Sequence, residues 1–179
     1  NNIIRCLLER DTTVIRVPWN HDLSQLEFDG IFLSNGPGDP QICSELIRNI
    51  QPFFVKDIPV FGICLGSQIM GLAAGANTYK LKYGHRGHNQ PVQEVNSHNC
   101  FITTQNHGYV VDEKTLPEGW EPLFINLNDH SCEGIRHKSK PFFATQFHPE
   151  ASGGPQDTEF LFDEFIKLVE GQKLKSDVL

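Results

Sequence analysis

The fold is decided by one stretch of the chain, Pro59-Val60-Phe61-Gly62-Ile63-Cys64-Leu65-Gly66-Ser67-Gln68. Its apolar first half predicts a buried strand over residues 59–63, and its continuation predicts a helix over residues 65–74 that ends at Gly75. The cysteine at the junction lies in the pattern G-x-C-x-G, the cysteine form of a turn that presents a nucleophile between a strand and a helix. A helix N-terminus favours a thiolate over a thiol, which suits Cys64 to nucleophilic attack. The alternative at this point is a buried cysteine between two incidental glycines.

The chain on the N-terminal side of this stretch repeats the order of strand and then helix. Residues 31–33 predict a second buried strand, and residues 34–40 (SNGPGDP) predict a loop. Asp39 is placed to cap a helix that has Pro40 at its first position and runs to about Phe54. Strands joined by crossover helices pair in parallel, so this half of the chain predicts a parallel sheet.

The two ends of the chain supply further elements. Apolar residues at 3, 4, 7 and 8 predict an opening helix, and the β-branched residues 13–17, closed by Pro18, predict a short strand. A last amphipathic helix is expected after a cap at Asp157, with Phe160, Leu161, Phe165 and Leu168 buried. Alternating segments in the second half predict antiparallel or mixed strands over residues 91–95, 100–104, 123–126, 134–137 and 142–147.

This order of elements predicts one α/β domain. We expect an open, mostly parallel sheet with flanking helices on both faces over residues 1–170, and a polar tail or linker over residues 171–179. In such a sheet, the loops after neighbouring parallel strands share one crevice. The loop at residues 34–40 and Cys64 both follow such strands, so we expect them to lie together.

A second chemical motif lies at Gln146-Phe147-His148-Pro149-Glu150, directly after an expected strand. Pro149 biases the residue before it towards an extended conformation, in which residues two apart face the same way. His148 and Glu150 can therefore point to one side, with the carboxylate orienting the imidazole. With Cys64 they would form the nucleophile, base and orienting group needed for acyl transfer. The alternative is a histidine at a strand end beside a surface carboxylate.

The loop Asn35-Gly36-Pro37-Gly38-Asp39 is a candidate oxyanion site. Its two glycines allow the backbone to approach a ligand and to point N–H groups at it. It is not a phosphate-binding loop, because the chain has neither a GK[ST] nor a G-x-G-x-x-G pattern here. The alternative is a plain turn.

Charge and cysteine spacing exclude several classes of function. The formal net charge is −7, with no basic block, which disfavours nucleic acid and anionic membranes as partners. The longest apolar stretches, such as residues 58–65, are far shorter than the roughly 20 residues of a membrane span. The five cysteines are widely spaced and form no CxxC or CxxH pair, so we expect reduced thiols and no structural zinc site.

The remaining histidines offer weaker alternatives. His85 and His88 form H-x-x-H, but no third ligand accompanies them at a useful spacing, so we expect no metal. Arg86 between them is expected in a loop or an interface. His107 flanks Asn106, which alone would be read as a turn residue, and His148 is the better candidate base because Glu150 accompanies it.

Together these motifs resemble the triad-type, or class I, glutamine amidotransferases, through Gly62 to Gln68 (GICLGSQ) and His148-Pro149-Glu150. The resemblance narrows to the glutaminase, or small-subunit, portion of carbamoyl phosphate synthetase. It rests there on four further stretches: 34–40 (SNGPGDP), 84–92 (GHRGHNQPV), 105–109 (QNHGY) and 153–162 (GGPQDTEFLF). It runs from the first residues to about Val169. It implies a flavodoxin-like fold.

The resemblance also implies roles for individual residues. Cys64 would be the nucleophile, His148 the general base and acid, and Glu150 the orienting carboxylate. Gly36 and Leu65 would supply the N–H groups of the oxyanion hole. The α-amino and α-carboxylate groups of glutamine would be held by Gly38, Gln68, Asn106, Gly108 and Tyr109.

The family pattern differs from this chain in two respects. Many members have histidine where this chain has Ser67, a position that neighbours the nucleophile but lies outside the triad. The family also carries an N-terminal domain and a first sheet strand upstream of the position that aligns with Asn1. We therefore expect a fragment of a longer chain, with a sheet that lacks its first strand.

The resemblance further implies a synthetase partner, either a large subunit or fused synthetase domains, that receives ammonia and itself uses ATP and Mg²⁺. No cofactor is expected in this chain, and its location would be intracellular, cytoplasmic or mitochondrial. Arginine and pyrimidine synthesis both stay open, with residues 150–162 leaning towards a eukaryotic arginine-type enzyme. The alternatives are a triad amidotransferase that serves another synthetase, of the anthranilate or GMP type, and a non-catalytic scaffold of the same fold.

Overall fold

The computed structural model describes residues 2–176, with side chains described as far as residue 172. Seven strands form one open sheet in the order β1-β2-β7-β6-β5-β3-β4. Strands β1 (Ile31–Leu33), β2 (Val60–Ile63) and β7 (Phe142–Thr145) are parallel neighbours. The other four are joined antiparallel: β6 (Cys132–His137), β5 (Trp120–Asn126), β3 (Thr78–Glu94) and β4 (Cys100–Val111).

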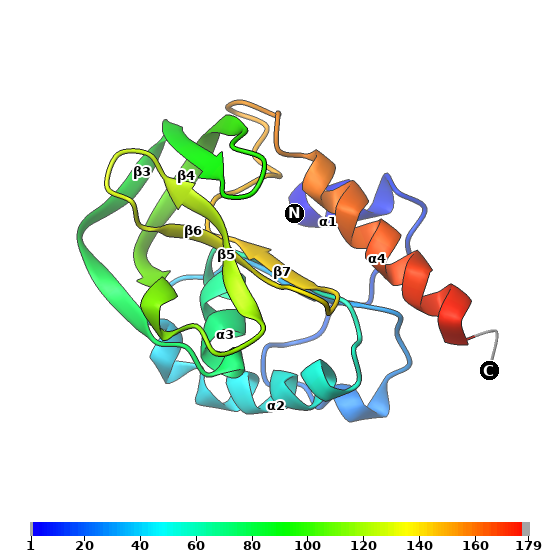
Figure 1. Ribbon diagram of the computed structural model, residues 1–179. Helices are drawn as coiled ribbons and strands as arrows, with labels where there is room; N and C mark the ends of the chain where they lie inside the picture. Colours follow the sequence, from blue (N-terminus) through cyan, green and yellow to red (C-terminus); the bar gives the residue numbers. More distant parts are fainter. Residues whose placement is uncertain (1, 177–179) are drawn as a thin grey trace.

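Helices cover both faces of the sheet (Figure 1). Helices α2 (Ser44–Val55) and α3 (Leu65–Ala74) pack on one face, where Ile50 and Ile69 join the β-strand residues Val60 and Ala144 in one core cluster. Helices α1 (Asn2–Leu8) and α4 (Phe160–Ser176) pack on the other face, through Leu7 and Phe162. This confirms the expected open α/β sheet with helices on both faces.

The second core is unusually aromatic. The Phe61 ring stacks on Phe143 with centroids 4.3 Å apart, and Phe32 lies against both Phe61 and Phe162. These rings come from β2, β7, β1 and α4, so one cluster fixes the parallel strands to the last helix. Strand β2, which ends directly before Cys64, is therefore packed through Phe61 against β1, β7 and α4.

Three short 3₁₀ helices each begin after an aspartate that caps them. The Asp39 side chain accepts a hydrogen bond from the Gln41 N–H at the start of a 3₁₀ helix, η2 (Pro40–Ile42), and α2 begins after it at Ser44. Two other 3₁₀ helices, η1 (Leu23–Gln25) and η3 (Glu113–Thr115), lie in connections. Gly75 ends α3 in the left-handed conformation, as the sequence predicted.

One predicted strand is wrong. Residues 13–17 form no strand, because a strand needs a hydrogen-bonded neighbour, and in the described part of the chain β1 ends the sheet with β2 as its partner. Val14 still packs against the aromatic core, whereas Ile15 is exposed. β-Branched residues favour extended backbone, but they do not supply a partner.

Strands β3 and β4 are much longer than the sequence predicted. They form a ribbon that continues from the expected segments through Gly84 and Gly87, both of which have positive φ. The register shifts on each side of the pairs His85 to Gly87. These irregularities interrupt the alternation of apolar and polar residues, which is the signal by which a strand is recognised.

Smaller differences concern the C-terminal elements. Strand β7 ends at Thr145, before the expected end at residue 147, and α4 begins at Phe160 after a turn at residues 157–159, so Asp157 is not directly at its start. Helix α4 continues through residue 176, across most of the segment expected as a tail. Residues 177–179 lie outside the described part. None of the helices in the described part is long and apolar enough to span a membrane.

Candidate active site

Cys64 occupies a sharp turn between β2 and α3. Its φ of 55° and ψ of −105° are rare for a residue with a side chain, and the turn has room only for glycine on either side. A Cβ on Gly62 would lie 2.6 Å from the Gly66 carbonyl oxygen, and a Cβ on Gly66 would lie 2.0 Å from that of Leu33. The two glycines are therefore required by the packing of strand against helix, which rejects the interpretation that they are incidental.

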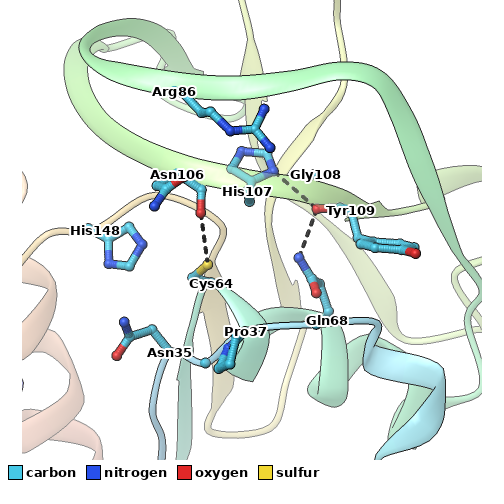
Figure 2. Close-up of a pocket in the computed structure, with 12 residues that line it drawn as sticks. Asn35, Pro37, Cys64, Gln68, Arg86, Asn106, His107, Gly108, Tyr109 and His148 are labelled. Atoms are coloured by element: carbon cyan, nitrogen blue, oxygen red, sulfur yellow. Dashed lines mark hydrogen bonds between the residues drawn. The ribbon is translucent and has the colours of Figure 1, made fainter.

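His148 follows β7 and lies opposite the Cys64 sulfur (Figure 2). Its backbone N–H donates to the Thr104 carbonyl at 2.9 Å, and its ring Nδ1 lies 2.8 Å from Glu150 Oε1. Burial acts to lower the pKa of His148, but hydrogen bonds to Cys64 and Glu150 outweigh it and raise the pKa to about 10. The imidazole is therefore paired with the carboxylate and protonated at neutral pH. The Cys64 sulfur lies 4.0 Å from the Asn106 carbonyl oxygen (Figure 2).

Replacing Glu150 with glutamine tests whether its carboxylate acts on the imidazole of His148. The amide oxygen can still accept the Nδ1–H hydrogen bond, but the negative charge is lost, so the pKa of His148 should fall from about 10 towards the ordinary 6.5. An NMR titration of the His148 ring protons measures the shift. An unchanged titration would show that the carboxylate does not act on the imidazole.

Gly36 and Leu65 meet beside the turn. A Cβ on Gly36 would lie 2.6 Å from Leu65 Cδ2, so the loop after β1 is packed directly on the first residue of α3. The first N–H groups of an α-helix have no acceptor within the helix. The backbone of these two residues is therefore placed to supply the oxyanion donors that the resemblance implies, and this role stays a prediction.

A pocket of about 410 Å³ opens in front of the cysteine, which is within the range of small-molecule sites. It brings together eight of the ten predicted site residues: Gly36, Gly38, Cys64, Gln68, Asn106, Gly108, Tyr109 and His148. Leu65 and Glu150 lie behind this lining, next to Gly36 and His148 respectively. The structure thus gathers the predicted site from the turn between β2 and α3, from α3 itself, from β4, from the loop after β1 and from the segment after β7.

The side chain of Gln68 is already engaged on its nitrogen. Its Nε2 donates to the Tyr109 carbonyl at 2.8 Å and to Gln146 Oε1 at 3.0 Å. His107 Nδ1 donates to the same Tyr109 carbonyl at 3.1 Å (Figure 2). Both N–H bonds of the Gln68 amide are thereby used, so only its oxygen is available to accept a hydrogen bond from a ligand.

Four further residues line the pocket: Asn35 and Pro37, which belong to the predicted oxyanion loop, and Arg86 and His107, which the sequence did not assign to the site. Arg86 was expected in a loop or an interface, and Asn106, taken alone, in a turn. They are instead paired residues of β3 and β4. One signal could have indicated Arg86. It lies in residues 84–92, a stretch that carries the family resemblance, and this stretch pairs with the strand that contains the predicted site residues of 105–109. Burial and the neighbouring His85 lower the pKa of His107 to about 3, so a neutral His107 has no acidic proton for a leaving group, unlike His148.

The H-x-x-H pair does not come together as metal ligands. His85 is buried and His88 is exposed, with its Nδ1 beside Thr104 Oγ1. His85 instead gathers with His107 and Glu133, whose candidate ligand atoms lie within 4.8 Å of one another. Glu133 was not singled out from the sequence, because a glutamate in a short strand usually faces water.

The sequence of this chain matches a known family. A family model described as glutamine amidotransferase class-I matches residues 1–168. The chain belongs to this family. Within it, the amidotransferase domain from residue 1 to residue 168 includes each residue of the candidate site.

Similar proteins are named for carbamoyl phosphate synthesis. The amidotransferase chain is 54% identical over 173 residues to the carbamoyl phosphate synthase arginine-specific small chain of Debaryomyces hansenii, covering 94% of this chain and 40% of that one. It is 53% identical over 175 residues to the mitochondrial carbamoyl-phosphate synthase [ammonia] of Mus musculus, covering 97% of this chain and 12% of that one. The chain therefore spans less than half the length of these relatives.

Solved structures share the fold. A protein from Thermoplasma acidophilum described as part of a putative GMP synthase aligns with a TM-score of 0.84 and 26% identity, covering 99% of this chain and 91% of that one. A glutamine amidotransferase from Thermotoga maritima aligns with a TM-score of 0.57 and 21% identity, covering 83% of this chain and 66% of that one, and shows the fold alone.

Proposed function

We propose that this chain hydrolyses glutamine to glutamate and ammonia through a thioester on Cys64. The observation that carries the proposal is the grouping of three side chains: Cys64 and His148 line the pocket, and Glu150 lies behind them, 2.8 Å from His148 Nδ1. Overall similarity alone would not decide it, because a relative named for ammonia is about as similar as one named as a small chain. A non-catalytic scaffold would have no need of the three groups in this arrangement.

The geometry suggests a two-stage reaction. The Cys64 thiolate attacks the side-chain carboxamide carbon of glutamine, and the carbonyl oxygen becomes an oxyanion facing the Gly36 and Leu65 N–H groups. His148 gives its proton to the departing nitrogen, which leaves as ammonia, and a γ-glutamyl thioester stays on the sulfur. His148, now neutral, accepts a proton from water, which attacks the thioester and releases glutamate.

The pocket polarity fits the amino-acid end of the substrate. Backbone groups of Gly38, Gly108 and Tyr109, with the free oxygen of Gln68, would orient the α-amino and α-carboxylate groups. Arg86 is a lining cation that can attract the α-carboxylate. Each stays a proposal until a ligand is bound.

We further propose that the ammonia passes to a carbamoyl phosphate synthetase partner, which uses its own ATP and Mg²⁺. The relatives named as small chains and the multifunctional protein URA2 of Saccharomyces cerevisiae, 53% identical over 169 residues, support a partner in either a separate or a fused chain. The alternative is that the ammonia passes to a GMP-type synthetase. The fold shared with the Thermoplasma protein supports this alternative, but that protein is 26% identical, whereas the small chain of Debaryomyces hansenii is 54% identical.

Glutamine-dependent release of glutamate tests the first proposal. We expect glutamate and ammonia in equal amounts. Ammonia release from asparagine should be much slower, because its side chain is one methylene shorter and its carboxamide would not reach the sulfur. A glutamine-like chloroketone should alkylate Cys64, as mass spectrometry can show. No glutamate above the blank, with Cys64 left unmodified, would reject the proposal.

The partner is tested by adding synthetase subunits. With a carbamoyl phosphate synthetase large subunit present, glutamine should replace free ammonia as the nitrogen donor for carbamoyl phosphate. A GMP-type synthetase mixed in the same way is the control. If the large subunit makes carbamoyl phosphate from ammonia but not from glutamine and this chain, the partner is wrong.

A further inference from the structure

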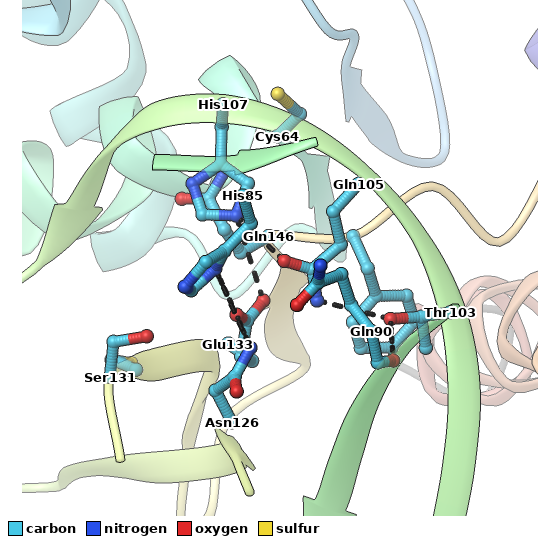
Figure 3. A network of polar contacts seen from close by, with 12 residues as sticks. Cys64, His85, Gln90, Thr103, Gln105, His107, Asn126, Ser131, Glu133 and Gln146 are labelled. Atoms are coloured by element: carbon cyan, nitrogen blue, oxygen red, sulfur yellow. Dashed lines mark hydrogen bonds and ion pairs between the residues drawn. The ribbon is translucent and has the colours of Figure 1, made fainter. Parts of the chain in front are cut away.

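A carboxylate is buried beneath the pocket wall. Glu133, on β6, has no exposed surface, and its Oε1 accepts a hydrogen bond from Asn126 Nδ2 at 2.9 Å (Figure 3). His85 Nδ1 lies 3.0 Å from the same oxygen. Burial raises the pKa of the Glu133 carboxyl, and the hydrogen bonds from His85 and Asn126 oppose that rise. Because a buried charge is costly unless it is paired, this carboxylate depends on His85.

His85 bridges two carboxylates. Its Nε2 lies 2.9 Å from Asp129 Oδ2, so each ring nitrogen faces a carboxylate oxygen and both must carry protons. The hydrogen bond to Glu133 raises the pKa of His85 to about 9, against the effect of burial and with help from Asp129. His85 is therefore protonated, and positively charged, at neutral pH.

These hydrogen bonds favour an ion pair over a metal centre. One Glu133 oxygen, Oε1, accepts hydrogen bonds from both His85 and Asn126. The second oxygen, Oε2, has no hydrogen-bond partner in the described part of the chain and lies 4.0 Å from His107 Nε2. Hydrogen bonds from His85 and Asn126 to one oxygen of Glu133 are the contacts expected of an ion pair, whereas a metal ligand would direct that oxygen at the ion.

The bridge lies at a weak section of the β3–β4 ribbon. His85 pairs with His107, and Arg86 pairs with Asn106, between two shifts of register. In this section β3 has β4 as its strand neighbour, because its pairing with β5 begins at Val92. Within the sheet, this part of the ribbon is therefore paired with itself and not with β5 or β6. Outside the sheet ladder, the Thr104 carbonyl accepts from the His148 N–H, and the Tyr109 carbonyl accepts from Gln68.

The same section carries one wall of the pocket. Arg86, Asn106, His107, Gly108 and Tyr109 all line it. The rings of His85 and His107 meet edge to face with centroids 4.9 Å apart, so the anchored side chain of β3 supports a side chain of β4 directly. His107 in turn donates to the Tyr109 carbonyl.

We propose that Glu133 and His85 are positioning residues, whose buried ion pair ties the β3–β4 ribbon to β6 and so holds the 106–109 wall in the conformation that binds glutamine. The proposal rests on the proposed function for the identity of the ligand. The triad is positioned mainly by other elements, because Cys64 follows β2 and His148 follows β7. Its contacts with the ribbon are the His148 N–H bond to the Thr104 carbonyl and the Cys64 sulfur, which lies 4.0 Å from the Asn106 carbonyl oxygen. The pair therefore acts on binding more than on the chemical steps.

Kinetics of Glu133→Gln and His85→Gln test the proposal. KM for glutamine should rise about tenfold, the scale of one lost buried hydrogen bond to a charged group, while kcat changes by less than about threefold. Alkylation of Cys64 by iodoacetamide, which needs no glutamine pocket, should keep its rate. The matched control is Glu121→Gln, which removes an ion pair with Arg136 between β5 and β6 away from the pocket and should leave KM unchanged.

Amide hydrogen exchange gives a readout that does not need activity. In Glu133→Gln the amides of residues 105–109 should exchange faster, whereas those of β2 and β7 should not. If Glu133→Gln does not fold, Asp129→Asn removes the more exposed partner of His85, and KM should then rise by about threefold.

The outcomes separate the two proposals. An unchanged KM with unchanged exchange at 105–109 overturns the positioning role, as does a loss confined to kcat. If the unsubstituted chain releases no glutamate, the proposed function fails, and the exchange experiment still decides whether Glu133 and His85 hold the ribbon.

Discussion

Replacing Cys64 with alanine is expected to lower glutamine hydrolysis by at least about 10³-fold, since Cys64 is the one cysteine among the described residues that line the pocket. Cys64→Ser should be nearly as slow, because a serine hydroxyl is a much weaker nucleophile than a cysteine sulfur. Glutamate release under saturating glutamine is the measurement.

The matched control for this substitution is Cys100→Ala. Cys100 is an exposed cysteine of β4, outside the pocket lining, and its loss should leave hydrolysis unchanged. If Cys64→Ala keeps a rate close to that of Cys100→Ala, the sulfur is not the nucleophile and the proposed reaction is wrong.

Replacing Gly66 with alanine is expected to destabilise the fold by about 3 kcal/mol or more, or to prevent folding. The new Cβ would lie 2.0 Å from the Leu33 carbonyl oxygen, a backbone atom that can move only by shifting β1. Chemical denaturation followed by circular dichroism measures the change in the free energy of unfolding.

Gly171→Ala is the control for the effect of adding a methyl group. Gly171 lies in α4, and a Cβ there meets nothing within 4 Å, so alanine should raise the free energy of unfolding by about 0.5–1 kcal/mol through helix propensity. Equal stability of the two variants would show that α3 and β1 can separate freely.

The sequence predicted the features whose cause is local. The turn at Cys64 needs Gly62 and Gly66 within a few residues, and the His148–Glu150 pair needs only an extended segment. The capping side chain of Asp39 and the stop at Gly75 are equally local. Such signals can be read from a short window. The expected helix from Pro40 to about Phe54 is nevertheless divided: Asp39 caps a 3₁₀ helix over Pro40–Ile42, and α2 begins separately at Ser44.

Features that depend on distant partners were not predictable in this way. Residues 13–17 have the composition of a strand, but pairing is decided by the neighbour and not by the segment. Glu133 resembles a surface residue of a strand until His85, far earlier in the chain, is brought against it. The length of the β3–β4 ribbon was hidden by the glycines that bend it.

The carbonyl of Tyr109 accepts hydrogen bonds from Gln68 on α3 and from His107 on β4. One oxygen atom thereby locks a helix to a hairpin before any ligand arrives. The conformational entropy of that arrangement is lost during folding and not during recognition. An incoming amino acid should consequently meet a preorganised receptor, and its affinity should reflect the contacts it makes rather than the ordering it must impose.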